Sequence, residues 1–212
     1  MNKFELFKEN INHKYPNKLN INLSPSSSFR CRSEFSYKDN HYVMHDENKK
    51  IYMSSFYKAS NVIQKVMPEL LNEINNSNSI KDKLFQINFR SNKNNNVMVT
   101  LIYHKNVESL VDKIKAISKK LKIQIILRSK KYFYSTNNIF FKDYLDFQNL
   151  KIYQTDNCFY QPNRFLVDKM IFTVLDFIES PMDLLELYCG VGTFTLPLST
   201  IFNKVLATES DR

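Results

Sequence analysis

The sequence predicts an α+β region over residues 1–155, followed over residues 156–212 by the opening of a Rossmann-like α/β unit. One observation is a strand, strand, helix, strand pattern over residues 83–127. Another is that the only two glycines of the 212-residue chain, Gly190 and Gly192, stand between a short apolar strand and a helix. With 43% apolar residues, a chain of this length suits one large or two small globular domains.

The first region begins with a predicted helix over residues 3–13 and a polar loop, containing Pro25 and three serines, over residues 17–28. Alternating apolar and polar residues then predict an antiparallel meander of three strands at 29–37, 42–45 and 51–53. Ser60 is placed to cap the helix that follows, and Pro68 is expected to kink or restart that helix.

Two further strands, at residues 83–90 and 97–103, are joined by a polar run and predict a hairpin. Over residues 107–121, apolar side chains recur at every third or fourth position, which predicts an amphipathic helix, and residues 123–127 form an apolar strand after it. Residues 130–134 combine two lysines with three aromatic residues, a pattern typical of a segment that is half core and half surface.

The second region opens with an aromatic turn at residues 157–163, and Asn163 is placed to cap a helix that ends before Pro181. A short strand of the buried type, a helix and a second strand follow, at residues 184–188, 193–202 and 204–209. One strand–helix–strand unit cannot cover both faces of a parallel sheet, so we expect the chain to be a piece of a longer protein.

Charge is distributed unevenly along the chain. Residues 1–165 hold 27 Lys and Arg against 14 Asp and Glu, a net charge of +13, whereas residues 166–212 hold 3 against 7, a net charge of −4. A basic first region suits a polyanion such as nucleic acid, although a lysine-rich solvated surface is an alternative that charge alone leaves open. The absence of an apolar leader or span, together with an odd number of cysteines, favours a reduced cytoplasmic protein without membrane contact.

The glycine turn predicts a ligand site. Gly190 and Gly192 provide a backbone that side chains would obstruct, and the helix after them offers free N–H groups. Glu209 stands 19 residues after Gly190 at the end of the second strand, where an acid accepts hydrogen bonds from ribose hydroxyls. Together the glycine turn and Glu209 indicate an adenosine-type pocket. The alternative interpretation is a plain tight turn with Glu209 as a solvated surface acid.

The run from Leu184 to Phe194 resembles the S-adenosylmethionine loop of the RNA uracil-5-methyltransferases. Four upstream segments resemble, in order and spacing, the bacterial tRNA (uracil-5-)-methyltransferase family: residues 30–35, 83–87, 101–105 and 159–163. The resemblance implies an α+β RNA-binding domain followed by the start of an S-adenosylmethionine-dependent methyltransferase domain. It also implies methylation of C5 of a T-arm uridine in tRNA, to give ribothymidine, through a cysteine adduct at C6 of the uracil.

The resemblance assigns roles to individual residues. With the two glycines, the positions that match cofactor contacts are Gln161, Tyr188, Thr193 and Glu209. Those that match RNA contacts are Arg30, Arg32 and Phe85, with a charged strand face and a core position as their respective alternatives. Residue 193 is usually Asn in the tRNA enzymes, and its replacement by Thr leaves a hydroxyl that hydrogen-bonds differently.

The resemblance places no catalytic residue in this sequence. The family's cysteine nucleophile and its glutamate base are expected beyond residue 212, so the chain alone is expected to be inactive. Cys189 is expected to be a small buried packing residue, and the spacing of the four histidines, His13, His41, His45 and His104, predicts no metal site.

Two other functions stay open at this point. One is a non-catalytic RNA-binding protein that retains part of the cofactor loop, and the other is methylation of ribosomal rather than transfer RNA. The upstream segments favour tRNA as the partner, and the complete protein is expected to be a monomer.

Overall fold

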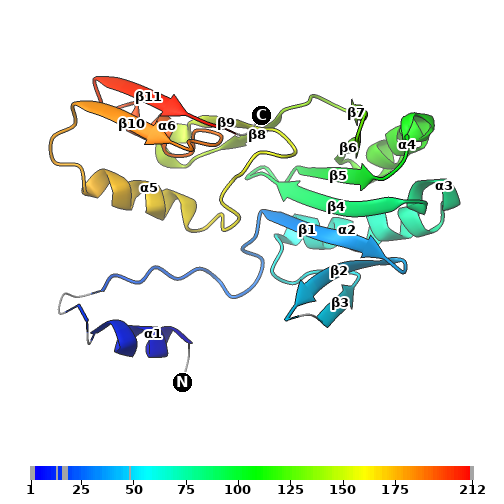
Figure 1. Ribbon diagram of the computed structural model, residues 1–212, viewed down its shortest axis with the longest axis horizontal. Helices are drawn as coiled ribbons and strands as arrows, with labels where there is room; N and C mark the ends of the chain where they lie inside the picture. The colour runs from blue at the N-terminus through cyan, green and yellow to red at the C-terminus, as the bar shows by residue number, and fades with distance from the viewer. Residues whose placement is uncertain (1–2, 13, 16–18, 48, 211–212) are drawn as a thin grey trace.

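A seven-stranded mixed sheet forms the centre of the molecule in the computed structural model, which describes residues 3–12, 14–15, 19–47 and 49–210 (Figure 1). The strand order is β3-β2-β1-β4-β5-β6-β7. All neighbours are antiparallel except β5 and β6, which run parallel. The strands are β1 (Arg32–Lys38), β2 (His41–Asp46), β3 (Lys49–Met53), β4 (Leu84–Ser91), β5 (Val97–Tyr103), β6 (Gln124–Ser129) and β7 (Tyr132–Ser135).

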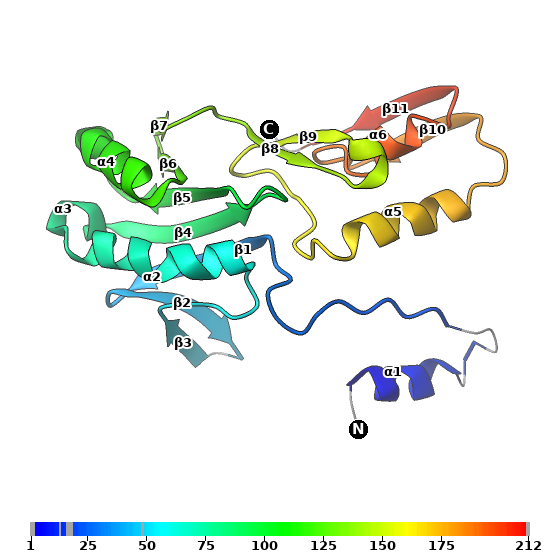
Figure 2. The ribbon, with the colours of Figure 1, turned by 180° about the vertical axis from the view of Figure 1, so that it is seen from behind.

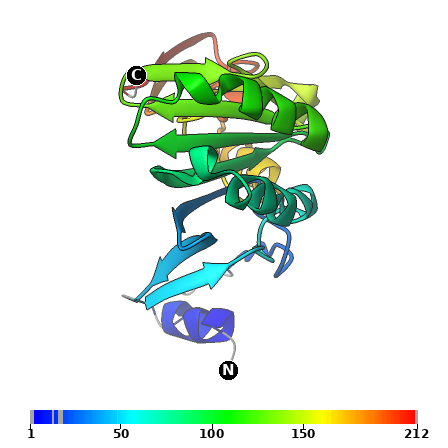
Figure 3. The same ribbon diagram turned by 90° about the vertical axis from the view of Figure 1, so that its right-hand side faces the viewer.

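Helices cover one face of this sheet. Figures 2 and 3 show α2 (Asn61–Asn75), α3 (Asn78–Lys81) and α4 (Val111–Leu121) on the same side, and α4 connects the parallel strands β5 and β6 after a short 3-10 turn, η1 (Glu108–Leu110). Alternate residues of the strands, such as Phe35, Ile87 and Leu101, pack against these helices in the main hydrophobic core. The predicted meander, hairpin and amphipathic helices are therefore confirmed.

A small antiparallel hairpin, β8 (Phe141–Tyr144) and β9 (Lys151–Gln154), covers part of the opposite face of the sheet. Its two strands are joined through the 3-10 turn η2 (Phe147–Asn149). Phe141 of the hairpin packs on Met98 and Ile126, which point away from the helices. At this end of the sheet, the helices thus cover one face and the hairpin covers the other.

The C-terminal region contains α5 (Val167–Asp176), β10 (Asp183–Leu187), α6 (Thr195–Leu198) and β11 (Lys204–Thr208). Strands β10 and β11 pair in parallel, as expected for the opening of a Rossmann-like sheet. The predicted burial of the first strand is wrong in part, because Leu185 and Leu187 are more than half exposed. The helix α1 (Lys3–Asn12) lies away from the central sheet, on the side of α5 (Figure 1).

A second hydrophobic cluster joins segments that are distant in sequence. It unites Cys31 with Leu145 and Ile152 of the hairpin region and with Tyr160, Val167 and Ile171. The predicted division at residues 155 and 156 passes through this cluster, and that division stays a prediction.

Several expected element boundaries are wrong. Pro68 lies inside a continuous α2, with no break in the helix. Helix α5 begins at Val167 instead of directly after Asn163. The Asn163 Oδ1 still accepts a hydrogen bond from the Phe165 N–H at 3.2 Å, and its amide donates to Ser24 Oγ at 2.9 Å. The helix expected at residues 193–202 is a single turn, α6, that contains Pro197, with turns after it.

Candidate functional site

The turn between β10 and α6 is held in an unusual backbone conformation. The chain leaves β10 through Tyr188 at φ +59°, followed by Gly190 at φ +57° and Gly192 at φ +78°. The Cys189 N–H donates to Thr208 O at 3.0 Å, so the turn stays attached to β11. Three left-handed residues within five positions turn the backbone sharply at the carboxyl end of the strand.

The reason for glycine at these positions differs from the expected one. A Cβ atom built on Gly190 would lie 3.7 Å from Phe159 O, and one on Gly192 would lie 3.5 Å from Leu196 Cγ, both ordinary van der Waals contacts. Crowding is therefore not what excludes a side chain. The positive φ values favour glycine, because other residues, such as Tyr188 in this turn, adopt this region at a cost.

Glu209 bonds directly to this turn. Its Oε2 accepts a hydrogen bond from the Gly190 N–H at 2.7 Å, and its Oε1 accepts one from the Ser210 N–H at 2.7 Å. The carboxylate lines a hollow of about 240 Å³ with Leu187, Tyr188, Thr208 and Ser210. The second strand thus ends in an exposed acid that is fixed against the glycine turn, as the sequence spacing predicts.

The segment that carries Gln161 lies against the same turn, since Phe159 O would lie 3.7 Å from a Cβ atom built on Gly190. It is fastened to the start of β1, where the Cys31 N–H donates to Pro162 O at 2.8 Å and the Cys31 thiol donates to Gln161 O at 3.4 Å. Thr193 is only 7% exposed, so this predicted contact residue is buried. Of the predicted cofactor residues, Tyr188 and Glu209 therefore line the hollow, whereas Thr193 is buried.

The two predicted RNA-facing arginines share one hollow. Arg30 and Arg32 line a hollow of about 360 Å³, whose other walls are Ser33, Glu34, Met44, Phe56, Phe159, Tyr160 and Pro162. Arg32 Nε donates to Glu34 Oε1 at 2.8 Å, and Arg32 Nη1 donates to Cys158 O at 3.3 Å. Arg32 is thereby oriented and partly neutralised, and the hollow adjoins the Gln161 segment.

Phe85 is 45% exposed, which excludes the alternative that it is a core residue. Its ring lies against that of His104, with ring centroids 4.4 Å apart. The two residues come from adjacent strand ends, because Lys83 O accepts a hydrogen bond from the His104 N–H. Sequence reasoning missed His104, although the pairing of residues 83–90 with 97–103 could have placed it beside Phe85.

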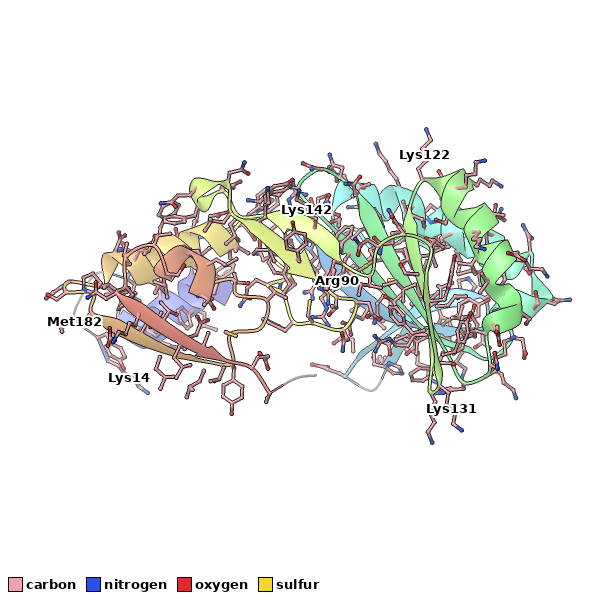
Figure 4. The ribbon with its side chains drawn as sticks, turned by 90° about the horizontal axis from the view of Figure 1, so that it is seen from above. Lys14, Arg90, Lys122, Lys131, Lys142 and Met182 are labelled. Atoms are coloured by element: carbon pink, nitrogen blue, oxygen red, sulfur yellow. The ribbon has the colours of Figure 1, made fainter. Side chains whose placement is uncertain are left out.

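Arg90 is a second residue that the sequence did not single out. It is 3% exposed, and its guanidinium donates to Gln154 Oε1 at 2.9 Å, to Asp156 O at 3.3 Å and to Cys158 O. Burial lowers the pKa of Arg90. Figure 4 shows the side chain where the sheet meets the β8–β9 hairpin, so Arg90 ties β4 to the segment that leads to Gln161.

None of the three cysteines has the environment of an activated nucleophile. Burial raises the pKa of the Cys31 thiol to about 11, which keeps it protonated. The Cys158 thiol donates to Thr155 O at 3.2 Å. Cys189 is half-buried within the glycine turn, so the expectation of a small buried packing residue is wrong in part.

Among the described residues, no group of three His, Cys, Asp or Glu side chains could hold a metal ion, and His13 lies outside those residues. Nor does any described helix have the length and apolar character needed to cross a membrane.

Comparison with known proteins identifies the family. The model of the family "tRNA (Uracil-5-)-methyltransferase" matches residues 1–212. Relatives named tRNA/tmRNA (uracil-C(5))-methyltransferase include one from Campylobacter lari, 39% identical with 92% of this chain and 58% of that protein aligned. Another, from Aliarcobacter butzleri, is 38% identical with 96% and 61% aligned. The chain thus spans about three fifths of the length of these relatives.

A solved structure shares the fold. The crystal structure of Pyrococcus abyssi tRNA (uracil-54, C5)-methyltransferase in complex with S-adenosyl-L-homocysteine superimposes with a TM-score of 0.76. The two sequences are 17% identical, and the alignment covers 98% of this chain and 56% of that one. Since the family model matches every residue, this chain belongs to the tRNA (uracil-5-)-methyltransferase family.

Proposed function

We propose that this protein takes part in transfer of a methyl group from S-adenosylmethionine to C5 of a T-arm uridine in tRNA. The observation that carries the proposal is the bond between the Glu209 carboxylate and the Gly190 N–H, which joins the two halves of the predicted cofactor site. The Glu209 carboxylate accepts hydrogen bonds from the backbone N–H groups of Gly190 and Ser210 and stands at the end of the second strand. An acid at this place in a Rossmann-like unit is the group that binds the ribose hydroxyls of an adenosine.

The residues of this chain bind and orient the reactants. S-adenosylmethionine supplies an electrophilic methyl group when bound. Tyr188 and Glu209 would hold its adenosine part, and the segment with Gln161 would close the pocket from the side of β1. On the RNA side, Arg30 and Arg32 would bind phosphates, and Phe85 would replace the stacking that an opened nucleotide loses.

We place the nucleophile and the base outside these 212 residues. C5 of uracil becomes a sufficient nucleophile only after a thiolate adds to C6 and makes C5 enolate-like. The buried Cys31 thiol, with its raised pKa, is a poor source of thiolate, and the relatives extend well beyond the aligned part. We further propose that the complete protein is a cytoplasmic monomer.

The test is transfer of labelled methyl groups to an unmodified tRNA transcript by the protein of the whole reading frame. One labelled uridine in the T-arm is expected, and no product is expected from the 212-residue chain. Methylation of ribosomal RNA instead of tRNA would overturn the substrate assignment. Product from the 212-residue chain would overturn the placement of the nucleophile.

Cofactor binding is tested separately with Glu209→Gln. We expect about a tenfold weaker affinity for S-adenosylhomocysteine in calorimetry, because a charged acceptor contributes about 1.5 kcal/mol more than a neutral one. Glu179→Gln, an exposed glutamate away from the turn, is the matched control and should leave the affinity unchanged. Equal affinities of the two variants would contradict the assigned role of Glu209.

A further inference from the structure

A basic groove of about 790 Å³ lies at the carboxyl ends of the parallel strands β5 and β6. Residues 102–106 and 108 form one wall, and residues 128–132, which include the tight turn between β6 and β7, form the other. We call this feature the lysine groove. It is separate from the hollow that Arg30 and Arg32 line and from the glycine turn.

Cations outnumber acids in the lining of the lysine groove. Four cations line it, Lys105, Arg128, Lys130 and Lys131, with Glu108 as the single lining acid. Two of these cations are neutralised by acids outside the lining. Lys105 pairs with Asp82 at 3.0 Å and also donates to Ser79 O at 2.8 Å, and Arg128 pairs with Asp156 at 2.6 Å.

Lys130 and Lys131 differ from the other two cations. Both are exposed, and within the part of the chain that the structure describes neither lies within 4 Å of a carboxylate. Figure 4 shows Lys131 extending from the edge of the sheet into solvent. Two adjacent cations on a tight turn, without acidic partners, are free to bind an external anion.

The lysine groove also reaches the proposed RNA-binding aromatic residue. His104 lines the groove and lies against Phe85 at a centroid distance of 4.4 Å, and Tyr132 adds a second ring to the lining. Aromatic rings beside lysines form the combination that binds unpaired nucleic acid, in which rings stack on bases and cations bind the backbone.

We propose that the lysine groove binds backbone phosphates of the RNA next to the nucleotide that packs on Phe85. The proposal rests on the proposed function, because it takes RNA as the partner. The lysine groove adds a second RNA contact, at the other end of β4 from Arg32. Arg32 is the register partner of Arg90 near the end of β4, whereas Phe85 stands at the start of that strand. The RNA contact would then extend along β4, a distance of about 20 Å for a strand of this length.

The test compares two double variants of the 212-residue chain in binding to an unmodified tRNA transcript, measured by fluorescence anisotropy over a series of salt concentrations. Lys130→Gln/Lys131→Gln removes the two unpaired cations. Lys65→Gln/Lys119→Gln removes two exposed lysines from α2 and α4, on the face that the helices cover, and is the matched control. Thermal melts confirm that both variants are folded.

We expect the groove variant to bind tRNA roughly tenfold more weakly near 0.1 M salt, and its salt slope to fall by roughly 1.5, since each lost phosphate contact lowers the slope by about 0.7 to 0.9. The control should keep the wild-type slope. Equal slopes for the two variants, with tRNA binding by the wild-type chain intact, would overturn the groove and leave the proposed function standing. If the wild-type chain binds poly-glutamate as tightly as tRNA, both the RNA-binding role of the lysine groove and the proposed function are overturned.

Discussion

At the scale of single residues, the shape of the glycine turn depends on the left-handed backbone conformation of Gly190 and Gly192. We predict that Gly190→Ala lowers the free energy of unfolding by about 1 kcal/mol, because alanine pays for the left-handed conformation that glycine adopts freely. Urea denaturation measures this change. Gly190→Asn is the control and should cost less, since asparagine tolerates this region better.

An alanine variant as stable as the wild type would show that the turn relaxes to another conformation. The cofactor affinity of this alanine variant should then change as well, because the backbone N–H of residue 190, which donates a hydrogen bond to Glu209, would move.

Cys31 provides a prediction about pH. With a pKa raised to about 11, the folded protein at pH 8 should hold roughly 0.1% of this thiol as thiolate. Alkylation of Cys31 by iodoacetamide should therefore be on the order of 100-fold slower than that of an exposed cysteine with an ordinary pKa. It should speed up as the pH rises toward 11. Peptide mapping by mass spectrometry measures the rate, with the denatured chain as control, and fast labelling at pH 8 in the folded state would contradict the burial of Cys31.

At the scale of elements, Arg90 connects β4 with β9 and the segment after it. Arg90→Met should lower the free energy of unfolding by about 3 kcal/mol, because it leaves Gln154 Oε1 and two backbone carbonyls without this donor. Arg90→Lys keeps the charge without the fork of donors and should lose about half as much. Chemical denaturation of the three proteins tests the order, and an Arg90→Met variant as stable as the wild type would remove the proposed link.

The elements that the sequence predicts well are those with a strong period. Alternation marks β1 to β5, and the helical repeat marks α2 and α4, because each buries one face in the main core. The sequence did not reveal β7, β8 and β9, which have four residues each and too few positions to show alternation. Nor did it place Arg90, because two of its three partners are backbone carbonyls of the segment that follows β9, and a backbone carbonyl is the same in every residue type.

The same reasoning applies to the site. Gly190, Gly192 and Glu209 are local to one strand–turn–strand unit, so their spacing alone predicts that they meet. His104 meets Phe85 only through the register of β4 and β5, and the lysine groove depends on where two parallel strands end. Such features follow from pairing between distant segments, which no local pattern determines.

At the scale of the whole molecule, the β10–β11 pair leaves an apolar face uncovered. Leu185, Leu187 and Leu206 are 60%, 61% and 64% exposed, and Leu185 is the register partner of Leu206 on the same face. We predict that the isolated chain self-associates through this face. Light scattering against concentration measures the effect, and Leu185→Lys/Leu206→Lys should reduce it several-fold.

The control is a second exposed pair of leucines, Leu6 and Leu23, which are 48% and 57% exposed. The Leu6→Lys/Leu23→Lys variant changes the net charge of the chain by the same amount as Leu185→Lys/Leu206→Lys. If the two double variants reduce scattering equally, the effect belongs to net charge and not to the β10–β11 face.

The attachment of Cys31 to Gln161 also governs the order in which the molecule can fold. The two residues are 130 positions apart, and closing a loop of that length costs about 4 kcal/mol of chain entropy. The helix-covered sheet, built largely from neighbouring segments, can form while residues 157–163 are still unattached. Arg30 and Arg32 therefore acquire their final surroundings late, at the same step that brings the Gln161 segment to the sheet. In a refolding reaction, the amide of Cys31 and those of this segment should gain protection from hydrogen exchange together, after the central strands.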